Sequence, residues 1–415
     1  MKPIHSIEEV VQAGLCISCG ACVSAAPEDA VSLVLTQRQS FTPRVNAAKL
    51  DGQDAAFRVC PGKGVPIRSL TMELYGSAPF ETFELGRYRV AAAWRSTSEE
   101  ILRAASSGGV MTAVAQYLLQ KGLIQGVTAS RLIYGSTGPV TQSFVARSRA
   151  DLLTAQGSKY CPTTTNVLVR SCMKEGGRYL FCGTPCQVAA LRLAARDNPD
   201  INRVFPYTMA NFCGGFRPFE FLDDIIVSLG IPPRDIHFFR FRGGGQPGSL
   251  LACAENGRSV TEPYPDYIVR STVPKMKRCW YCLDATGELA DFACGDAWLP
   301  RFLRDSHGWS IVLGRSSFAE TVLQDMVHDG HLIRQEVSCQ EICQSQKSNI
   351  TSKKYRQHSR IRVSRFMRIQ TPEWDVELPR MNRGMIHEFR ILLGKSAVGR
   401  RVSRLRRLVR GIPVR

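Results

Sequence analysis

Short apolar runs alternate with amphipathic stretches over most of the chain, from about residue 88 to residue 345. The run RVAAAW precedes the helical pattern GGVMTAVAQYLLQKG, and the run RYLFCG precedes PCQVAALRLAARD. In the last pattern Val188, Leu191 and Ala195 share one helical face, while Arg192 and Arg196 lie outside it. This alternation of strand-like and helical segments predicts a mixed α/β domain built around a sheet.

Glycine and proline mark the borders of this domain. Residues 1–66 form a cysteine-led unit that ends in the loop-like sequence RVCPGKGVP. We interpret residues 67–87 as a connector, residues 88–345 as the main domain and residues 346–415 as a basic, partly helical tail. The segment FFRFRGGGQPGS is predicted to be a loop, because three consecutive glycines do not sustain a helix or a strand. The expected fold class is therefore α+β or α/β, with a small N-terminal module before a larger domain.

The composition, with 44% hydrophobic and 22% charged residues among 415, is that of an ordinary globular protein. No run of 18 uncharged apolar residues occurs, so no membrane-spanning helix is predicted. The N-terminal sequence MKPIHSIEEVVQAG lacks the apolar core of a secretory signal, which predicts a cytoplasmic protein. Fifteen cysteines in that reducing compartment indicate metal or redox chemistry rather than disulfides.

Three cysteines near the N-terminus have the spacing of an iron–sulfur ligand loop. Cys16, Cys19 and Cys22 form a C-x2-C-x2-C pattern, but Ala26 stands where a ferredoxin motif has its fourth cysteine. We assign the missing ligand to Cys60, the next cysteine along the chain, which is followed by a proline. These four thiols predict one [4Fe–4S] cluster in a ferredoxin-like module, and a tetrahedral zinc site is the alternative.

Further cysteines lie in glycine-rich or aromatic segments. Cys279 and Cys282 form a C-x2-C pair in KRCWYCLDATG, Cys186 lies in FCGTPCQVAALR, and Cys213 lies in NFCGGF. A single C-x2-C pair is a weak signal, because it suits a redox dithiol as well as half of a metal site.

Several motifs resemble one known family. The segments SSGGVMTAVAQYLLQKGLI, GSKYCPT, GTPCQVAALR, FCGG and CWYCLDATGELADFACGDAW occur in the order found in the beta-subunit family of coenzyme F420 hydrogenases and dehydrogenases. The resemblance covers about residues 10 to 340 and leaves out the tail. It implies a flavin enzyme that carries one or two [4Fe–4S] clusters, with FAD lying between a cluster and the substrate.

Carried over motif by motif, the resemblance assigns a second cluster to Cys186, Cys213, Cys279 and Cys282. The sequence departs from the fuller family pattern, because its N-terminal unit holds cysteines for one cluster only. The remaining cysteines are interpreted as buried small apolar side chains. They are Cys161, Cys172, Cys182, Cys253, Cys294, Cys339 and Cys343.

A serine–glycine turn before a helical pattern is the candidate phosphate site. In SSGGVMTAVAQYLL we expect Ser106 or Ser107 to cap the helix. Gly108 and Gly109 would then expose backbone N–H groups at the positive end of the helix. By itself such a turn is usually only a helix cap, and the resemblance makes it the candidate site for the FAD pyrophosphate.

Two more segments complete the predicted flavin site. Gly157 and Ser158 allow close backbone approach, and Lys159 offers a cation to a phosphate or to the reduced ring. A solvated surface lysine is the alternative. Thr184 and Gln187 are expected near the flavin ring. Asp291 and Asp296 are interpreted as turn caps, with orientation of the cluster loop as the alternative, and Trp298 as a core residue.

The tail carries most of the positive charge. Residues 351–415 hold 18 Lys or Arg and 4 Asp or Glu, in a chain of net charge +18. Four apolar positions share one face of a short helix near the end: Val402, Leu405, Leu408 and Val409. This pattern suits peripheral contact with an anionic membrane surface. Nucleic acid ranks second, because no recognised nucleic-acid module accompanies the tail, and a disordered solubilising tail is the remaining alternative.

The predicted protein is thus a cytoplasmic iron–sulfur flavoprotein oxidoreductase, possessing an N-terminal iron–sulfur module and a flavin-binding α/β domain. Electrons would enter the N-terminal cluster from a reduced carrier such as ferredoxin. They would pass through the second cluster to FAD, and then to a small organic substrate or the deazaflavin coenzyme F420. Two alternatives stay open: a non-catalytic electron-relay subunit of a larger redox complex, and a zinc-stabilised protein that binds nucleic acid. The sequence is also compatible with assembly into an oligomer.

Overall fold

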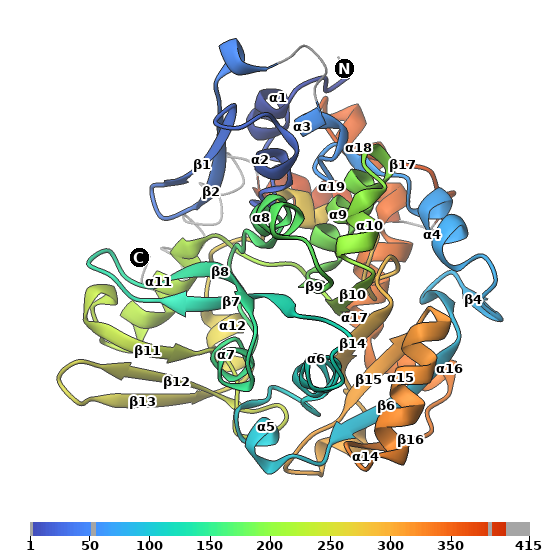
Figure 1. Ribbon diagram of the computed structural model, residues 1–415. Coiled ribbons are helices and arrows are strands. Elements are labelled where there is room, and N and C mark those ends of the chain that lie inside the picture. Colours follow the sequence, from blue (N-terminus) through green and yellow to red (C-terminus); the bar gives the residue numbers. More distant parts are fainter. Residues whose placement is uncertain (1–2, 51–54, 381–383, 396–415) are drawn as a thin grey trace.

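An eight-stranded mixed sheet forms the centre of the computed structural model, which describes residues 3–50, 55–380 and 384–395 (Figure 1). The strand order is β16-β6-β15-β14-β10-β9-β7-β8. Strands β14, β10, β9 and β7 are parallel, and antiparallel neighbours extend the sheet on both sides. The bounds are β6 (Val90–Ser96), β7 (Gly126–Ile133), β8 (Val140–Ala146), β9 (Tyr179–Gly183), β10 (Tyr207–Asn211), β14 (Phe292–Asp296), β15 (Ser310–Gly314) and β16 (Leu332–Gln335).

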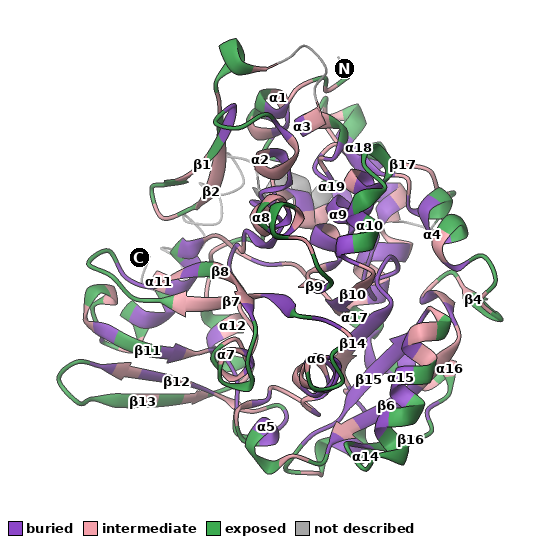
Figure 2. Cartoon of the chain, viewed as in Figure 1, coloured by how far each residue is buried: buried purple, intermediate pink, exposed green. Residues whose placement is uncertain are grey.

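The central strands are buried on both faces, because their sequences are continuous apolar runs rather than alternating ones. Tyr179, Leu180 and Phe181 of β9 are fully buried, and so is every residue of β15. The register places Met209 of β10 opposite Phe292 of β14. Figure 2 shows this buried centre, with the exposed residues gathered on the outer helices and loops.

Helices cover both faces of the sheet. Tyr179 and Phe181 pack with α9 (Pro185–Asp197), whereas Leu180 between them packs with α6 (Val110–Gln120) and α15 (Ser317–His328). Neighbouring residues of a strand point to opposite faces, so the two groups of helices lie on opposite sides. The predicted mixed α/β class is confirmed. Smaller helices complete the layers: α5 (Glu99–Ala104), α7 (Arg149–Thr154), η2 (Thr165–Val167), α8 (Leu168–Glu175), α10 (Asp200–Val204), α13 (Lys277–Trp280) and α14 (Pro300–Leu303).

Helix α9 has the predicted buried face. Val188, Leu191 and Ala195 are all buried. The prediction that Arg192 lies outside that face is wrong, since Arg192 is only 6% exposed. Its guanidinium is buried because it lies 3.1 Å from the carboxylate of Asp291, which anchors the helix to the sheet. Asp291 also accepts hydrogen bonds from β10, so it is a structural residue of the core rather than a turn cap.

A second, three-stranded antiparallel sheet contains β11 (Ile236–Arg240), β12 (Ser249–Ala254) and β13 (Ser259–Pro263). It packs against α11 (Phe219–Ser228) and α12 (Asp266–Arg270) around its own apolar core. The loop prediction for FFRFRGGGQPGS is wrong in its first part, because Phe238, Phe239 and Arg240 belong to β11. The glycines do form a loop, which lies between β11 and β12, and η3 (Pro233–Asp235) precedes β11.

The N-terminal unit contains one β-hairpin and several short helices. Its elements are α1 (Ile7–Gln12), α2 (Ala21–Ala25), β1 (Val31–Thr36), β2 (Ser40–Val45), η1 (Ala47–Lys49) and α3 (Ala55–Arg58). It is followed by β3 (Gly64–Val65), α4 (Ile67–Tyr75), and the hairpin of β4 (Phe80–Thr82) and β5 (Gly86–Tyr88). The ferredoxin-like character of this unit and the domain boundaries stay predictions.

The first part of the basic tail packs against the rest of the protein. It follows α16 (Cys339–Ser345) and contains α17 (Lys347–Ile350), the π-helical η4 (Thr351–Tyr355), α18 (Gln357–Phe366), β17 (Glu373–Trp374) and α19 (Gly384–Lys395). Ile361 of α18 packs with Val10 and Leu15 of the N-terminal unit. β17 pairs in parallel with β3. The predicted amphipathic helix with Val402, Leu405, Leu408 and Val409 lies outside the described residues.

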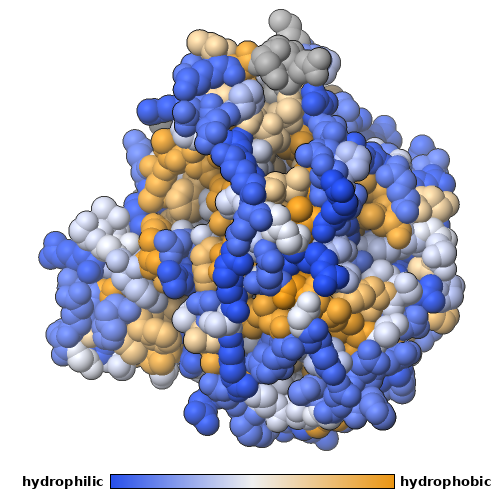
Figure 3. Space-filling view, in the orientation of Figure 1, coloured by the Kyte–Doolittle hydropathy of each residue, from blue (hydrophilic) through white to orange (hydrophobic). Residues whose placement is uncertain are grey.

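The face of the molecule in Figure 3 is largely hydrophilic, with smaller apolar areas between the polar ones. Over residues 3–50, 55–380 and 384–395, no helix has the length and apolar character needed to cross a membrane.

Candidate functional site

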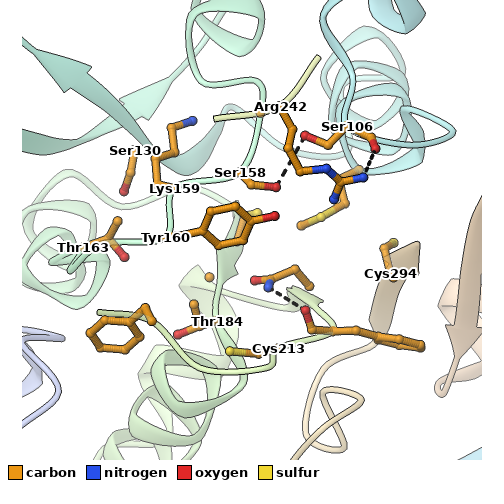
Figure 4. A pocket seen from close by; sticks show the side chains of 18 of the residues that line it. Ser106, Ser130, Ser158, Lys159, Tyr160, Thr163, Thr184, Cys213, Arg242 and Cys294 are labelled. Atoms are coloured by element: carbon orange, nitrogen blue, oxygen red, sulfur yellow. Dashed lines mark hydrogen bonds between the residues drawn. The ribbon is translucent and has the colours of Figure 1, made fainter. Parts of the chain in front are cut away.

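A cavity of about 490 Å³ opens beside the central sheet (Figure 4). Its wall includes Gly183 of β9, Asn211 of β10 and Asp296 of β14, which lie at the carboxyl ends of three parallel strands. Ligands of open α/β sheets bind outside this end of the strands. The volume lies in the range of cofactor pockets, so the cavity is the candidate flavin site.

The N-terminus of α6 opens onto this cavity. Gly109 occupies the N-cap position with a φ of +69°, and no side chain caps the helix. The prediction that Ser106 or Ser107 caps α6 is wrong. The Ser158 hydroxyl donates to Ser106 Oγ (3.4 Å), and the Ser107 hydroxyl lies 2.9 Å from Ser310 Oγ. Because both serines and Gly109 line the cavity, the first N–H groups of α6 are available to a ligand.

Gly108 is not among the residues that line the cavity. A Cβ atom at this position would lie 2.4 Å from the carbonyl oxygen of Trp94 and 2.8 Å from the amide nitrogen of Ser310. Its own carbonyl accepts the N–H of Ser96 (2.8 Å). The lack of a side chain at Gly108 therefore lets the turn pack against β6 and β15. Gly108 was predicted to expose its N–H group to the ligand, but it is not part of the cavity wall.

Lys159 supplies a cation to the cavity wall, next to Gly157 and Ser158. Its ammonium donates to the backbone carbonyls of Gln156 (3.1 Å) and Ala155. Within the described residues no carboxylate forms an ion pair with it, and burial lowers the pKa of Lys159 to about 8. The alternative of a solvated surface lysine is therefore wrong.

Thr184 and Gln187 line the cavity at the start of α9, but the Gln187 amide is used within the protein. Its Oε1 accepts the backbone N–H of Thr184 (2.9 Å), and its Nε2 donates to the carbonyl of Thr163 (2.8 Å). The Thr184 hydroxyl lies 3.2 Å from Sγ of Cys186. Gln187 thus fixes the turn that carries Cys186, and Thr184 lies between that thiol and the cavity.

Two side chains in the cavity wall carry buried polar atoms without a hydrogen-bond partner in the described part of the chain: Gln156 Oε1 and Arg217 Nε. An unsatisfied buried polar atom costs about 1–3 kcal/mol. Together with the Lys159 ammonium and the α6 N-terminus, these atoms fit a polar, anionic ligand such as a dinucleotide.

The four cysteines of the predicted first set surround one small cavity in the N-terminal unit: Cys16, Cys19, Cys22 and Cys60. The loop turns around this cavity through two residues in left-handed conformations, Ser18 (φ +60°) and Gly20 (φ +82°). The N–H of Ser18 donates to Sγ of Cys16 (3.4 Å). Such N–H···S contacts favour thiolate sulfur.

Burial raises the pKa of Cys16 to about 12 and also raises that of Cys19, Cys22 and Cys60. Neighbouring thiols add to the rise at the first three, whereas the charges of Lys63 and Arg278 oppose it at Cys60. Four buried thiols so close together do not all ionise unless cations bind the thiolates. The first set therefore fits an iron–sulfur group.

The second set is also brought together, from three separate segments: Cys186 on α9, Cys213 after β10, and Cys279 and Cys282 at α13. Burial raises the pKa of Cys186, and the other three thiols of the set add to this rise. The N–H of Gly215 donates to Sγ of Cys213 (3.3 Å), and a Cβ on Gly215 would lie 3.0 Å from Cβ of Cys279. Lys353 of the tail donates its ammonium to Sγ of Cys282 (3.3 Å).

Both sets lie beside the large cavity. Cys213 of the second set is part of the cavity wall, and Ile17 of the first loop lines both the large cavity and the small one. The sets are also joined directly, because Arg278 donates two hydrogen bonds to the carbonyl of Pro61 (3.1 and 2.8 Å). Arg278 precedes Cys279, and Pro61 follows Cys60.

Within the described ranges, no three or more His, Cys, Asp or Glu side chains form a group that could hold a single metal ion. A tetrahedral zinc ion draws four sulfurs to about 2.3 Å from one centre. A [4Fe–4S] cube binds each cysteine through a different iron, so its ligands stand further apart around a cavity. The zinc ion and the cube differ in the spacing of the sulfurs that they require, and both stay predictions for the two sets.

Two models of one family match the chain. The model of the coenzyme F420 hydrogenase/dehydrogenase beta subunit N-terminus matches residues 91–170, and that of its C-terminus matches residues 176–339. The chain belongs to this family. The resemblance inferred from the sequence motifs is thereby confirmed, and the family match ends before α17.

Relatives of this family member are oxidoreductases or their subunits. The coenzyme F420 hydrogenase subunit beta of Methanosarcina barkeri is 26% identical over 257 residues, 59% of this chain and 81% of that protein. A subunit of the F(420)H(2) dehydrogenase of Methanosarcina mazei is 25% identical over 328 residues, 78% of this chain and 85% of the relative. The coenzyme F420-dependent sulfite reductase of Methanocaldococcus jannaschii is 23% identical over 335 residues, 76% and 46% of the two chains. These relatives support a redox role.

A solved structure shares the fold. One chain of the F420-reducing [NiFe] hydrogenase complex from Methanosarcina barkeri aligns with a TM-score of 0.56 at 23% identity. The alignment covers 71% of this F420 hydrogenase/dehydrogenase beta subunit family member and 98% of that chain.

Sequence reasoning missed the charged and aromatic wall of the cavity. Arg242 is 2% exposed, with its guanidinium 2.5 Å from Asp296 and 4.6 Å from the ring centre of Tyr264. Trp298 stacks on Tyr264 with ring centres 5.7 Å apart, so its prediction as a core residue is wrong. Figure 4 shows Arg242 and Ser106 on the opposite side of the cavity from Cys213. No spacing or motif pointed to Arg242.

The interpretation of the other cysteines as buried small side chains is confirmed for Cys161, Cys172 and Cys294. The remaining four are partly exposed: Cys182, Cys253, Cys339 and Cys343. Cys182 lines the cavity on β9, together with Cys161 and Cys294.

Proposed function

We propose that this protein is an iron–sulfur flavoprotein that carries electrons between two [4Fe–4S] clusters and FAD, and from FAD to an organic acceptor. The observation that carries the proposal is the shared cavity wall. The cavity that fits the flavin includes Cys213 of the second set and Ile17 of the first loop. Electron transfer requires cofactors close to one another, and this arrangement supports such proximity.

The flavin would lie in the 490 Å³ cavity. The N–H groups at the start of α6 and the Lys159 ammonium would bind its phosphates, next to Ser106, Ser107 and Gly109. Bound FAD exchanges one electron at a time with iron–sulfur groups and two electrons, as a hydride, with an organic molecule. Arg242 and Trp298 would orient that molecule, since they lie in the same wall.

The clusters would be held by the two cysteine sets. Cys16, Cys19, Cys22 and Cys60 would form the entry site, which accepts electrons from a reduced carrier such as ferredoxin. Cys186, Cys213, Cys279 and Cys282 would form the site next to the flavin. Groups of buried thiols with raised pKa values support iron binding, because such thiols lose their protons only when a cation binds the sulfurs.

The names of the relatives support coenzyme F420 as the organic acceptor or donor, because each relative above is named for it. Two of these names also describe subunits. That observation favours the second candidate function, an electron-relay subunit whose substrate is handled by a partner chain. The two functions differ in whether the isolated chain itself exchanges electrons with coenzyme F420.

Purification of the full chain without oxygen tests the proposal. We expect about eight iron and eight sulfide atoms and one FAD per chain, with the broad brown absorbance of [4Fe–4S] clusters. After reduction with dithionite and removal of the excess, the flavin spectrum should recover when coenzyme F420 is added. Recovery identifies the enzyme, whereas recovery only in the presence of a partner identifies the relay subunit.

The matched control is Cys253→Ser, which removes a thiol that lies outside both sets. This variant should keep its full iron and flavin content. A wild-type chain with one iron or less, or with stoichiometric zinc and no flavin absorbance, contradicts the proposal.

A further inference from the structure

Lys353 is a buried cation that forms no ion pair with a carboxylate among the described residues. It lies in the π-helical segment η4, beyond the residues matched by the family models, and is only 3% exposed. The next residue, Lys354, is also buried, but its ammonium lies 2.5 Å from the carboxylate of Glu288. In the described part of the chain, no carboxylate lies within ion-pair distance of the Lys353 ammonium. Segments of π-helix within helices occur frequently at functional sites.

The contacts of Lys353 lead to the second cysteine set. Its ammonium donates to Sγ of Cys282 (3.3 Å) and to the backbone carbonyl of Asp284 (2.8 Å). The Asp284 carboxylate itself accepts three backbone N–H groups and is directed at the turn that follows.

Other charges near the set do not replace Lys353. Lys275 is exposed, and its ammonium donates to the carbonyl of Gly214 (2.7 Å). Lys354 is neutralised by Glu288. A buried ammonium is costly unless an anion lies beside it, so the position of Lys353 calls for negative charge on the sulfurs of the set.

We infer that Lys353 is the charge partner of the cluster held by Cys186, Cys213, Cys279 and Cys282, and that it raises the reduction potential of that cluster. The inference rests on the proposed function, because it requires the second cluster. It adds a residue from outside the shared family region, and it gives the buried part of the basic tail a role in electron transfer.

The chemical step is a one-electron reduction. Four thiolates and an oxidised [4Fe–4S]²⁺ core carry a total charge of −2, and one electron from the reduced carrier brings the charge to −3. No bond is formed or broken and no proton is transferred. The Lys353 ammonium attracts the −3 state more strongly than the −2 state, so it favours reduction. The interaction is strong because the group is buried and little screened by salt.

The experiment is a redox titration of the full chain, purified without oxygen and followed by electron paramagnetic resonance. We expect Lys353→Met to lower the midpoint of one cluster by at least the equivalent of a tenfold change in its reduction equilibrium, 59 mV for one electron. Lys353→Arg, which keeps the charge, should stay near the wild-type midpoint. Lys347→Met removes an exposed lysine of the same tail and should change neither cluster.

A second comparison identifies the affected cluster. In a Cys279→Ser background, which would lack the second cluster, Lys353→Met should leave the remaining signal unchanged. In a Cys19→Ser background, which would lack the first cluster, Lys353→Met should lower the midpoint of the remaining signal by the same amount as in the otherwise wild-type chain.

Each outcome is decisive. If Lys353→Met keeps full iron content and the wild-type midpoints, the inference is wrong. If Lys353→Met loses the second cluster, the iron content of Lys353→Arg distinguishes charge from packing. Retained iron supports the charge pairing. Lost iron shows that the lysine serves only to fill space, which overturns the inference. If the wild-type chain has about four iron atoms and Cys279→Ser removes none, the proposed function fails instead.

Discussion

The two cysteine sets would hold the same kind of cluster, but the protein builds them in different ways. Three ligands of the first set come from one short loop, Cys16 to Cys22, which turns through left-handed residues. The ligands of the second set come from three segments that the central sheet brings together. Three ligands of the first set are therefore positioned by local structure, whereas the second set exists only when the whole α/β domain is folded.

The sets also differ in what contacts their sulfurs. At Cys16 of the first set and at Cys213 of the second, the donor is a backbone N–H, which is a dipole that the neighbouring chain supplies. At Cys282 the donor is the full positive charge of Lys353, from a distant part of the chain. A set assembled from separate segments can thus acquire a charge from yet another segment, and this allows two chemically similar clusters to differ in potential.

The largest expected effect comes from removing one ligand of each set. Cys19→Ser and Cys279→Ser should each lose about four of about eight iron atoms. Cys279→Ser should also lose much of its FAD, because its neighbour Cys213 forms part of the cavity wall, whereas Cys19→Ser should keep it. Iron and flavin analysis of both variants measures this. Equal loss of FAD in both would remove the distinction between the sets.

The second set should depend more strongly on the tail. Arg360 of α18 donates to the carbonyl of Trp280, between the two cysteines of the C-x2-C pair, and pairs with Glu388 at 3.0 Å. Both charged side chains are almost fully buried. Because Arg356 also pairs with Glu388 at 2.5 Å and would remain, Arg360→Met should lower the free energy of unfolding by about 1.5–3 kcal/mol. Chemical denaturation without oxygen checks this value.

The control for that prediction is Arg362→Met on the same helix. Arg362 is exposed, so its substitution should change stability by less than about 0.5 kcal/mol. We also expect Arg360→Met to release iron from the second set at lower denaturant than from the first. Simultaneous release from both sets would contradict a special dependence on the tail.

Lys159 provides a contrast to Lys353, because it faces carbonyl groups instead of sulfurs. Its pKa is lowered to about 8, so the free protein loses this charge as the pH rises through 8. FAD binding should then require uptake of a proton, and the affinity should fall by up to about tenfold per pH unit above pH 8. Titration of flavin-free protein with FAD between pH 7 and pH 9.5 measures the slope.

Titration of two nearby thiols does not contribute to the measured pH dependence. Burial raises the pKa of Cys161 and of Cys182 to about 12, above the range tested. Lys159→Met should bind FAD more weakly at pH 7 and with a flat pH profile. A profile that keeps its slope in this variant would assign the titration to another group.

The smallest effect is expected where the two sets meet. Arg278→Lys keeps the charge but cannot donate the same two hydrogen bonds to Pro61. We expect a loss of about 1 kcal/mol in stability with no loss of iron. Thermal unfolding and iron analysis of the variant check both expectations. Release of iron would show that this contact holds the ligands themselves.

The ligands of the first cysteine set could be predicted from sequence more directly than those of the second set, for a physical reason. A loop that wraps a cluster has fixed spacing, so Cys16, Cys19 and Cys22 could be recognised from sequence, and the proline after Cys60 pointed to that residue. Cys186 and Cys213 obey no spacing rule of their own. They were assigned only through the family resemblance, because a tertiary fold brings them together.

The errors have a common cause as well. Arg192, Arg242 and Lys353 were not expected to be buried, because burial of a charge depends on partners that are distant in sequence, such as Asp291 and Asp296. The helix cap was wrong because Gly109 adopts a left-handed conformation that ends the turn without a side chain. Patterns of apolar residues predicted the sheet and its helices, which depend on local periodicity.

The pairing of β3 with β17 has a consequence for synthesis of the protein. Gly64 lies so close to Glu373 that a Cβ atom there would be 2.1 Å from the Glu373 carbonyl oxygen. The strand that follows Cys60 therefore receives its partner only after almost the entire polypeptide has left the ribosome. If the two sets hold iron, the surroundings of both would be complete only after synthesis, because β17, Lys353 and Arg360 come from late parts of the chain.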